Sequence, residues 1–226
     1  RLACSEDAGK FLFGSKPFTV IRNGIPIEQF AYDTGINSGL RAEYGIPTDA
    51  PVIGCVGRMV KQKNYPFAVK VFAQFLRKWP DAKLVFIGDG TDRAELEQAI
   101  HNEGVTSSVL LLGVREDINR LYSMLDVFFM PSLYEGLPVS CVEAQASGLP
   151  CVYSTDVPHE SDITQTGLFV DRTADISQWV TALEQAMNGG RLTSNPEVLS
   201  ARGYSASANA EQLMRYYEQL MGAADE

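Results

Sequence analysis

The amino-acid sequence predicts an α/β protein in which a parallel sheet is covered by helices on both faces. From residue 51 onward, short apolar runs alternate with longer amphipathic segments, as expected for strands that alternate with helices. The short runs are apolar throughout, which is typical of strands buried on both faces of a sheet. The chain has 226 residues, 45% of them hydrophobic, and is long enough for one large domain with a full core.

The expected strands are short apolar runs: residues 51–56, 83–87, 109–112, 127–130, 151–153 and 167–170. The expected helices carry apolar residues at helical spacing: residues 65–79, 92–102, 117–125, 138–147, 176–187 and 206–221. Pro80 is expected to end the first of these helices, and Ser205 is suited to cap the last one.

The first fifty residues do not share this alternation. Residues 6–13 look like the end of a helix, and residues 19–22 form one expected strand. A polar stretch at residues 33–39 then leads into a short helix at residues 40–44.

We interpret residues 1–16 as the remnant of a preceding domain with its linker, and residues 17–204 as the main domain. Residues 205–226 then form a C-terminal helix that packs toward the missing domain, because its apolar residues exceed a single stripe. An ordinary irregular N-terminus is the alternative.

Composition excludes several classes of protein. Nineteen basic and 28 acidic residues give a formal net charge of −9, which argues against nonspecific nucleic-acid binding. The four cysteines include no C-x-x-C pair, so we expect buried free thiols in a reducing cytosol rather than the alternative, a disulfide framework. The two histidines, His101 and His159, lie away from the cysteines in the sequence, so we expect no zinc site. No apolar run reaches the roughly 20 residues of a membrane helix. The opening residues resemble no secretory leader, and a cytoplasmic location is expected.

Ligands of open parallel sheets bind beyond the carboxyl ends of the strands, and basic residues follow the first buried strand. Arg58 offers a planar fork of donors and Lys63 a point charge, a combination suited to phosphate oxygens. We expect both charges to be exposed, so that their removal changes the stability of the fold little. The alternative is that they serve only solubility.

Two further loops are less specific. In residues 88–90 (GDG) the third glycine of a dinucleotide fingerprint would fall on Arg93, so a tight turn is the better interpretation. In residues 113–117 (GVRED), Asp117 is a candidate helix cap and Arg115 a candidate surface ion pair.

The loop and helix at residues 131–144 are the most informative segment. Pro138 suits the first turn of the helix, and the free amides of Gly136, Leu137 and Val139 would attract an anion at its positive end. Glu135 and Glu143 suit a ligand with many hydroxyl groups. The alternative interpretation is that Glu135 caps the helix and Glu143 lies on a solvated face.

Together these motifs resemble the carboxy-terminal half of a retaining glycosyltransferase of family 4, which has the two-domain GT-B fold. The resemblance covers residues 4 to about 170, and Glu-x₇-Glu within PS-x-x-EG-x-P is its most specific part. The motifs follow in order: residues 20–25 (VIRNGI), Gly57-Arg58 with Lys63, residues 88–90, residues 121–122 with Asp126, residues 131–138, residues 143–144 and residues 148–150 (GLP). The resemblance implies a Rossmann-like sheet that forms one half of the GT-B fold.

The resemblance also implies roles for individual residues. Arg58 and Lys63 match the pair that binds the donor diphosphate, Glu143 the residue that binds the ribose, and Glu135 the residue that contacts the donor sugar. Glu135, Arg58 and Lys63 are thus the catalytic candidates, although Glu135 is not expected to be a nucleophile. The donor-binding candidates are Gly57, Gly113, Val114, Arg115, Gly136, Leu137, Pro138, Val139 and Glu143.

The chain departs from the family pattern in the loop after the first buried strand. Residues 59–62 replace a more usual acidic or proline-containing stretch, and Asn64 stands where glycine is common. Both departures leave the geometry of the loop open.

The implied reaction is transfer of a sugar from a nucleotide diphosphate to an acceptor hydroxyl with retention, in polysaccharide, glycan or glycolipid biosynthesis. No D-x-D triplet occurs, so we expect no metal and no cofactor, with a UDP-sugar as donor. The acceptor, a glycan or a lipid-linked molecule, and the family's catalytic histidine belong to the missing N-terminal domain, so this chain should be inactive alone.

The full-length protein is a candidate for a peripheral position at the inner face of the membrane. Two alternatives stay open: a nucleotide-sugar epimerase of similar architecture, and a noncatalytic nucleotide-binding α/β module. The motifs specify neither the base, the sugar, the acceptor, the pathway nor the oligomeric state.

Overall fold

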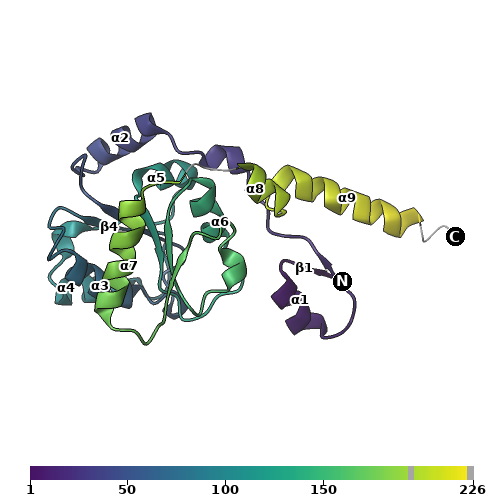
Figure 1. Cartoon of the computed structure of the whole chain (residues 1–226), viewed down its shortest axis with the longest axis horizontal. Coiled ribbons are helices and arrows are strands. Elements are labelled where there is room, and N and C mark those ends of the chain that lie inside the picture. The colour runs from purple at the N-terminus through teal and green to yellow at the C-terminus, as the bar shows by residue number, and fades with distance from the viewer. Residues whose placement is uncertain (193–195, 223–226) are drawn as a thin grey trace.

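A computed structural model describes residues 1–192 and 196–222 of the chain. Its body is a six-stranded parallel sheet with the strand order β5-β4-β3-β6-β7-β8 (Figure 1). The strands lie where the sequence predicts them, within two residues at either end: β3 Val52–Val56, β4 Lys83–Ile87, β5 Val109–Leu111, β6 Val127–Met130, β7 Cys151–Ser154 and β8 Leu168–Val170. The predicted α/β architecture with a parallel sheet is confirmed.

Helices cover both faces of this sheet and enclose two separate hydrophobic cores. One face carries α2 (Thr34–Glu43), α5 (Ile118–Met124), α6 (Val139–Ala146) and α8 (Pro196–Ala201). The other carries α3 (Tyr65–Phe75), α4 (Arg93–Asn102) and α7 (Ile176–Gly189). Adjacent strand residues serve opposite cores: Phe128 belongs to the first and Phe129 to the second, because successive side chains of a strand point to opposite faces.

The prediction for residues 33–44 is wrong in one respect, since α2 begins at Thr34 rather than at Leu40. The side chain of Asp33 caps it by accepting a hydrogen bond from the Ile36 amide at 2.9 Å. Arg41, which is buried on the other side of the helix, donates to both carboxylate oxygens of Asp126 at 2.8 Å. Tertiary contacts thus stabilise a helix whose Gly- and Asn-containing sequence has low intrinsic propensity.

Residues 1–20 form a small unit outside the sheet, in which β1 (Leu2–Ala3) pairs in parallel with β2 (Thr19–Val20). The helix between them, α1 (Glu6–Phe13), begins where Ser5 accepts a hydrogen bond from Ala8 at 3.1 Å. Residues 6–13 are therefore a complete helix, not the end of a longer one. The strand expected at residues 19–22 is only two residues long.

The last helix, α9 (Ala206–Gly222), extends away from the sheet, and the N-terminal unit lies beneath it (Figure 1). Ser205 accepts a hydrogen bond from the Ala208 amide at 3.4 Å, as the cap prediction requires. Part of residues 205–226 is outside the described residues. The division at residues 16 and 204 stays a prediction.

Several shorter features complete the description. The 3-10 turns are η1 (Ile27–Phe30), η2 (Lys61–Lys63), η3 (Thr106–Ser108) and η4 (His159–Ser161). All four cysteines are free, and Cys55, Cys141 and Cys151 are buried, so the predicted free thiols are confirmed. None of the helices in residues 1–192 and 196–222 is long and apolar enough to cross a membrane.

Candidate functional site

The candidate site lies where the strand order of the sheet reverses. From β3, the chain continues to β4 on one side, while β6 pairs with β3 on the other. Crevices at such switch points, beyond the carboxyl ends of the strands, are the usual ligand sites of open parallel sheets. The loops that meet there are residues 57–64 after β3 and residues 131–138 after β6, which carry Arg58, Lys63 and Glu135.

Lys63 and Glu135 form an ion pair across these two loops. The Lys63 Nζ atom is 2.7 Å from Glu135 Oε1, and the two side chains are only 12% and 6% exposed. Gln62 contacts the other carboxylate oxygen, donating from Nε2 to Glu135 Oε2 at 3.0 Å. The candidate phosphate-binding cation and the candidate sugar-binding carboxylate are thus neighbours, although 72 positions separate them in the sequence.

Arg58 differs from Lys63 in its environment. It is exposed, and within the described residues it makes no side-chain hydrogen bond or ion pair, so its guanidinium is free to meet a ligand. The expectation that both charges are exposed holds for Arg58 and is wrong for Lys63. The Lys63 side chain runs beside Gly57, where an added Cβ atom would approach Lys63 Cε at 3.0 Å and the Tyr65 hydroxyl at 3.1 Å.

Asn64 shows how the loop after β3 keeps its geometry without the glycine that is common at this position. Its φ of 54° and ψ of 37° lie in the left-handed region, which glycine adopts freely and asparagine tolerates better than most residues. Its side-chain amide donates to the Pro131 carbonyl at 3.2 Å. Asparagine therefore takes the conformation that a glycine would supply and adds a bond to the β6 loop.

The amino terminus of α6 directly follows the second of these loops. Pro138 is the residue before the helix, one position earlier than its predicted place in the first turn. In the described structure, no protein acceptor takes the amides of Gly136, Leu137 or Val139, so the positive end of the helix dipole is open to an anion. Glu135 does not cap the helix, because its carboxylate is held by Lys63 and Gln62.

Glu143 lies on α6 and is partly buried rather than on a solvated face. The Tyr122 hydroxyl donates to Glu143 Oε2 at 2.8 Å. Burial raises the pKa of Glu143 above its ordinary value of 4.5, and the Tyr122 hydrogen bond partly offsets this shift. The tyrosine thus holds one oxygen of this carboxylate.

Residues 113–115 lie at the same sheet edge, after β5. Gly113 has a φ of 66°, and its carbonyl accepts a hydrogen bond from the Gly88 amide at 2.8 Å, which ties this turn to the β4 loop. Val114 is 79% exposed. Arg115 forms an ion pair with Asp117 at 2.8 Å, and Asp117 makes no side-chain cap for α5. Arg115 thus forms a surface ion pair, and its assignment to donor binding stays a prediction.

Sequence reasoning did not assign roles to Gln62 and Tyr122, although both touch a candidate carboxylate. Tyr122 was visible only as part of a motif, and Gln62 as a departure from one. Nothing in the neighbouring sequence indicates that Gln62, directly before Lys63, contacts Glu135. The same holds for Tyr122, which lies 21 residues before Glu143. Both contacts depend on how the sheet places loops from different parts of the chain.

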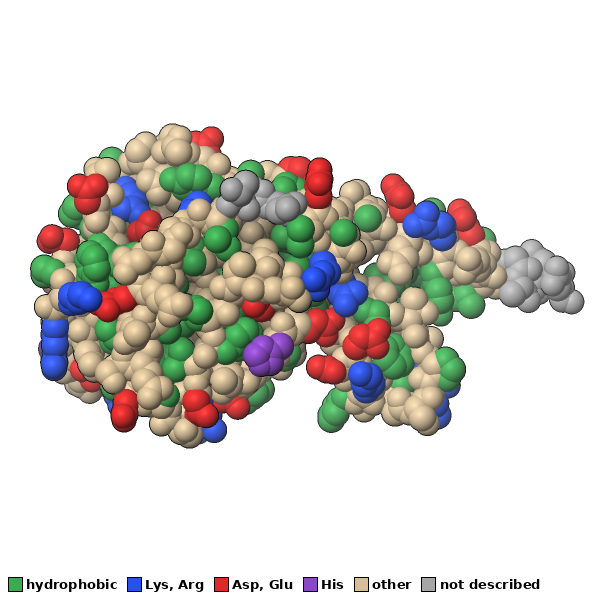
Figure 2. Space-filling model, viewed as in Figure 1, with side chains coloured by type: hydrophobic (Ala, Val, Ile, Leu, Met, Phe, Trp, Pro, Cys, Tyr) green, Lys and Arg blue, Asp and Glu red, His purple; other side chains and the backbone are tan. Residues whose placement is uncertain are grey.

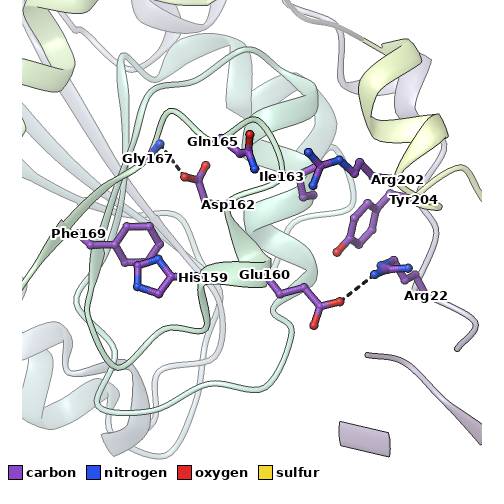
Figure 3. A pocket seen from close by; sticks show the side chains of 10 residues that line it. All are labelled: Arg22, His159, Glu160, Asp162, Ile163, Gln165, Gly167, Phe169, Arg202 and Tyr204. Atoms are coloured by element: carbon purple, nitrogen blue, oxygen red, sulfur yellow. Dashed lines mark hydrogen bonds and ion pairs between the residues drawn. The ribbon is translucent and has the colours of Figure 1, made fainter. Parts of the chain in front are cut away.

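A pocket of about 410 Å³ lies outside this site, between η4, the linker before η1 and the turn before α9. Figure 3 shows Arg22 and Glu160 pointing toward one another across it, at 2.9 Å, and His159 lying over the Phe169 ring. Asp162 accepts from the Gly167 amide at 3.0 Å. None of the pocket's lining residues belongs to the loops at residues 57–64 or 131–138, so this pocket is separate from the candidate site.

The surface agrees with the acidic composition. Figure 2 shows acidic side chains scattered over the visible face, without an extended basic patch on that face. Within residues 1–192 and 196–222, no group of three or more His, Cys, Asp or Glu side chains is placed to hold a metal ion.

Comparison with known proteins agrees with this architecture. A family model described as "Glycosyl transferases group 1" matches residues 38–205. EpsF of Bacillus subtilis, whose own assignment as a glycosyltransferase is provisional, is 37% identical over 227 residues, covering 95% of this chain and 58% of EpsF. An Escherichia coli UDP-Gal:alpha-D-GlcNAc-diphosphoundecaprenol alpha-1,3-galactosyltransferase is 36% identical over 141 residues, covering 60% of this chain and 36% of that protein.

Among solved structures, Anabaena Alr3699/HepE in complex with UDP superposes with a TM-score of 0.82 at 20% identity. The match covers 96% of this chain and 63% of that one. The fold is therefore the Rossmann-like half of a GT-B structure. The chain belongs to the glycosyl transferases group 1 family, as the motifs predicted, and this membership disfavours the epimerase and noncatalytic alternatives. The chain spans about half the length of the relatives it matches.

Proposed function

We propose that this chain is the donor-binding half of a retaining glycosyltransferase and binds a nucleotide-diphosphate sugar, with a UDP-sugar as the first candidate. The observation that carries the proposal is the Lys63–Glu135 pair at the switch point of the sheet. A phosphate-binding cation and a sugar-binding carboxylate are adjacent there, as the two halves of such a donor require. The relatives support this: one is named for UDP-Gal, and HepE structures contain UDP and UDP-glucose.

The chemistry follows from the charges in the crevice. During transfer, the bond between the anomeric carbon and the phosphate oxygen breaks, and negative charge grows on the leaving diphosphate. Arg58, Lys63 and the open amides of α6 would stabilise that charge, which lowers the barrier electrostatically. No cofactor or metal is needed for this step, so the proposal includes neither.

Transfer itself needs an acceptor hydroxyl, and we place the acceptor-binding site on a second domain of the longer protein. That domain would bind a glycan or lipid-linked acceptor and supply the remaining catalytic groups. The isolated chain should therefore bind donor and turn over little or none of it.

A thermal-shift panel tests the proposal. UDP-glucose, UDP-galactose, UDP-N-acetylglucosamine, GDP-mannose and ADP-glucose are added in turn, because a ligand at 100 times its Kd stabilises the folded state by about 2.7 kcal/mol. One nucleotide class should raise the melting temperature, and Arg58→Ala should reduce the shift. Absence of a shift with every nucleotide would contradict the proposal. A change of the sugar during incubation, detected by NMR, would instead indicate an epimerase.

A further inference from the structure

We propose that Gln62 is a positioning residue, which keeps Glu135 directed at the donor sugar when Lys63 turns from Glu135 to the diphosphate. The inference rests on the proposed function and deepens it, since it concerns the sugar half of the same site. Gln62 itself is not expected to touch the reacting atoms. It acts through Glu135.

Gln62 links the two loops of the site with three hydrogen bonds. Its Nε2 atom donates to Glu135 Oε2 at 3.0 Å and to the Tyr134 carbonyl at 2.9 Å. The backbone carbonyl of Gln62 accepts a hydrogen bond from the Leu133 amide at 2.8 Å. Both N–H groups of the side-chain amide are thus used on the β6 loop, and the backbone of residue 62 is fixed to the same loop.

The two oxygens of Glu135 have different partners. Oε1 lies 2.7 Å from the Lys63 ammonium, and Oε2 accepts from Gln62. A diphosphate carries more negative charge than a single carboxylate, and the lysine stem is flexible enough to follow it. A bound donor therefore competes with Glu135 for Lys63, and it has no such effect on the uncharged amide of Gln62.

The burial of Glu135 makes this second partner necessary. Its side chain is 6% exposed, and an ionised carboxylate left unpaired in such a place is strongly unfavourable. Without Gln62, Glu135 would have to leave its position once Lys63 moved. A glutamine suits the task because it donates to the carboxylate and adds no charge that would hold Lys63 back.

The experiment compares the binding of a nucleotide sugar with that of its nucleoside diphosphate. The probes are the tightest-binding nucleotide sugar of the panel above and the matching UDP, GDP or ADP, titrated by calorimetry. In Gln62→Ala, we expect diphosphate affinity within twofold of the unaltered chain and nucleotide-sugar affinity reduced at least fivefold. In Gln62→Glu, the loss for the sugar nucleotide should be larger, because the new carboxylate repels Glu135.

A matched control is Gln98→Ala on α4, where the glutamine donates to the neighbouring Asn102 at 2.8 Å; both affinities should remain unchanged. Equal losses for the diphosphate and the nucleotide sugar in Gln62→Ala would show general disruption of the loop and overturn the positioning role. Unchanged affinities would overturn it as well. If the unaltered chain binds no nucleotide, the proposed function itself fails. If the unaltered chain binds nucleotide and Gln62→Ala binds it equally well, only the positioning role fails.

Discussion

Lys63 and Arg58 carry the same charge in the same loop, and single substitutions should separate their effects. Replacing either with Ala removes charged hydrogen bonds to the diphosphate, so nucleotide affinity should fall by about 1.5–3 kcal/mol. Lys63→Ala should in addition lower the free energy of unfolding by about 3 kcal/mol, because it leaves the buried Glu135 carboxylate without a charged partner. Arg58→Ala should leave stability unchanged. Calorimetry and urea unfolding measure the two effects.

The double variant Lys63→Ala/Glu135→Ala is the control for this stability difference. It removes both buried charges and should recover most of the lost stability. A Lys63→Ala protein as stable as the Arg58→Ala protein would contradict the buried pair.

Glu135 and Glu143 should divide the recognition of the donor between them. Glu143→Ala should weaken nucleoside diphosphate and nucleotide sugar alike, because Glu143 is assigned to the ribose that both contain. Glu135→Ala should leave diphosphate binding nearly intact and weaken only the nucleotide sugar. Parallel titrations of both ligands check this, and identical profiles for the two variants would contradict the assignment.

The hydroxyl of Tyr122 should set the pH at which Glu143 stops binding. Burial already raises the pKa of Glu143, and the Tyr122 hydrogen bond opposes that rise. Only the ionised carboxylate accepts from two ribose hydroxyls, so nucleotide affinity should fall as the pH drops through this pKa. In Tyr122→Phe the pKa rises further, and the midpoint of the fall should move to higher pH. Tyr217→Phe, an exposed tyrosine on α9, should keep the original midpoint.

At the scale of elements, the turn from η2 into α3 depends on the left-handed conformation of Asn64. Asn64→Ala should cost about 1–2 kcal/mol for that backbone conformation and about 1 kcal/mol for the lost hydrogen bond to Pro131. Asn64→Gly should be the milder change, since glycine adopts the conformation freely. Urea unfolding of both variants checks the order, and an Ala variant more stable than the Gly variant would contradict it.

The elements that the sequence predicts well are those whose signal is local. Each strand from β3 to β8 is a short apolar run, and such a run needs no partner to be recognised. The helix α2 was placed six residues too late, because its stability comes from Arg41 and its contact with Asp126, 85 positions away. The six-residue α8 was not predicted at all.

The candidate site shows the same limit. The convergence of Arg58, Lys63 and Glu135 on one sheet edge follows from parallel strands alone, and their strand-end positions were visible in the sequence. The pairing of Lys63 with Glu135, and the contacts of Gln62 and Tyr122, follow only from the distance between loops. The roles of these residues in binding stay predictions.

At the scale of the whole molecule, α9 exposes more apolar surface than a helix in water usually does. Met214 is 61% exposed, Tyr217 51%, Leu220 52% and Met221 68%. We expect this surface to pack against the second domain in the longer protein and to cause self-association of the present chain. The double variant Met214→Lys/Tyr217→Lys should lower the average mass in light scattering. Gln219→Lys adds charge on the same helix without removing apolar surface and should leave the mass unchanged.

The chain enters and leaves the sheet body at one place. Ile25 bridges to Ser205, and Asn209 of α9 donates to the Arg22 carbonyl at 2.8 Å. Two segments of the chain therefore cross this junction side by side. The Arg22–Glu160 ion pair ties the first of them to the sheet domain. Because these two segments are bonded to each other, α9 and the N-terminal unit at residues 1–20 are tied together at the junction. A displacement of one of them relative to the sheet should therefore carry the other with it.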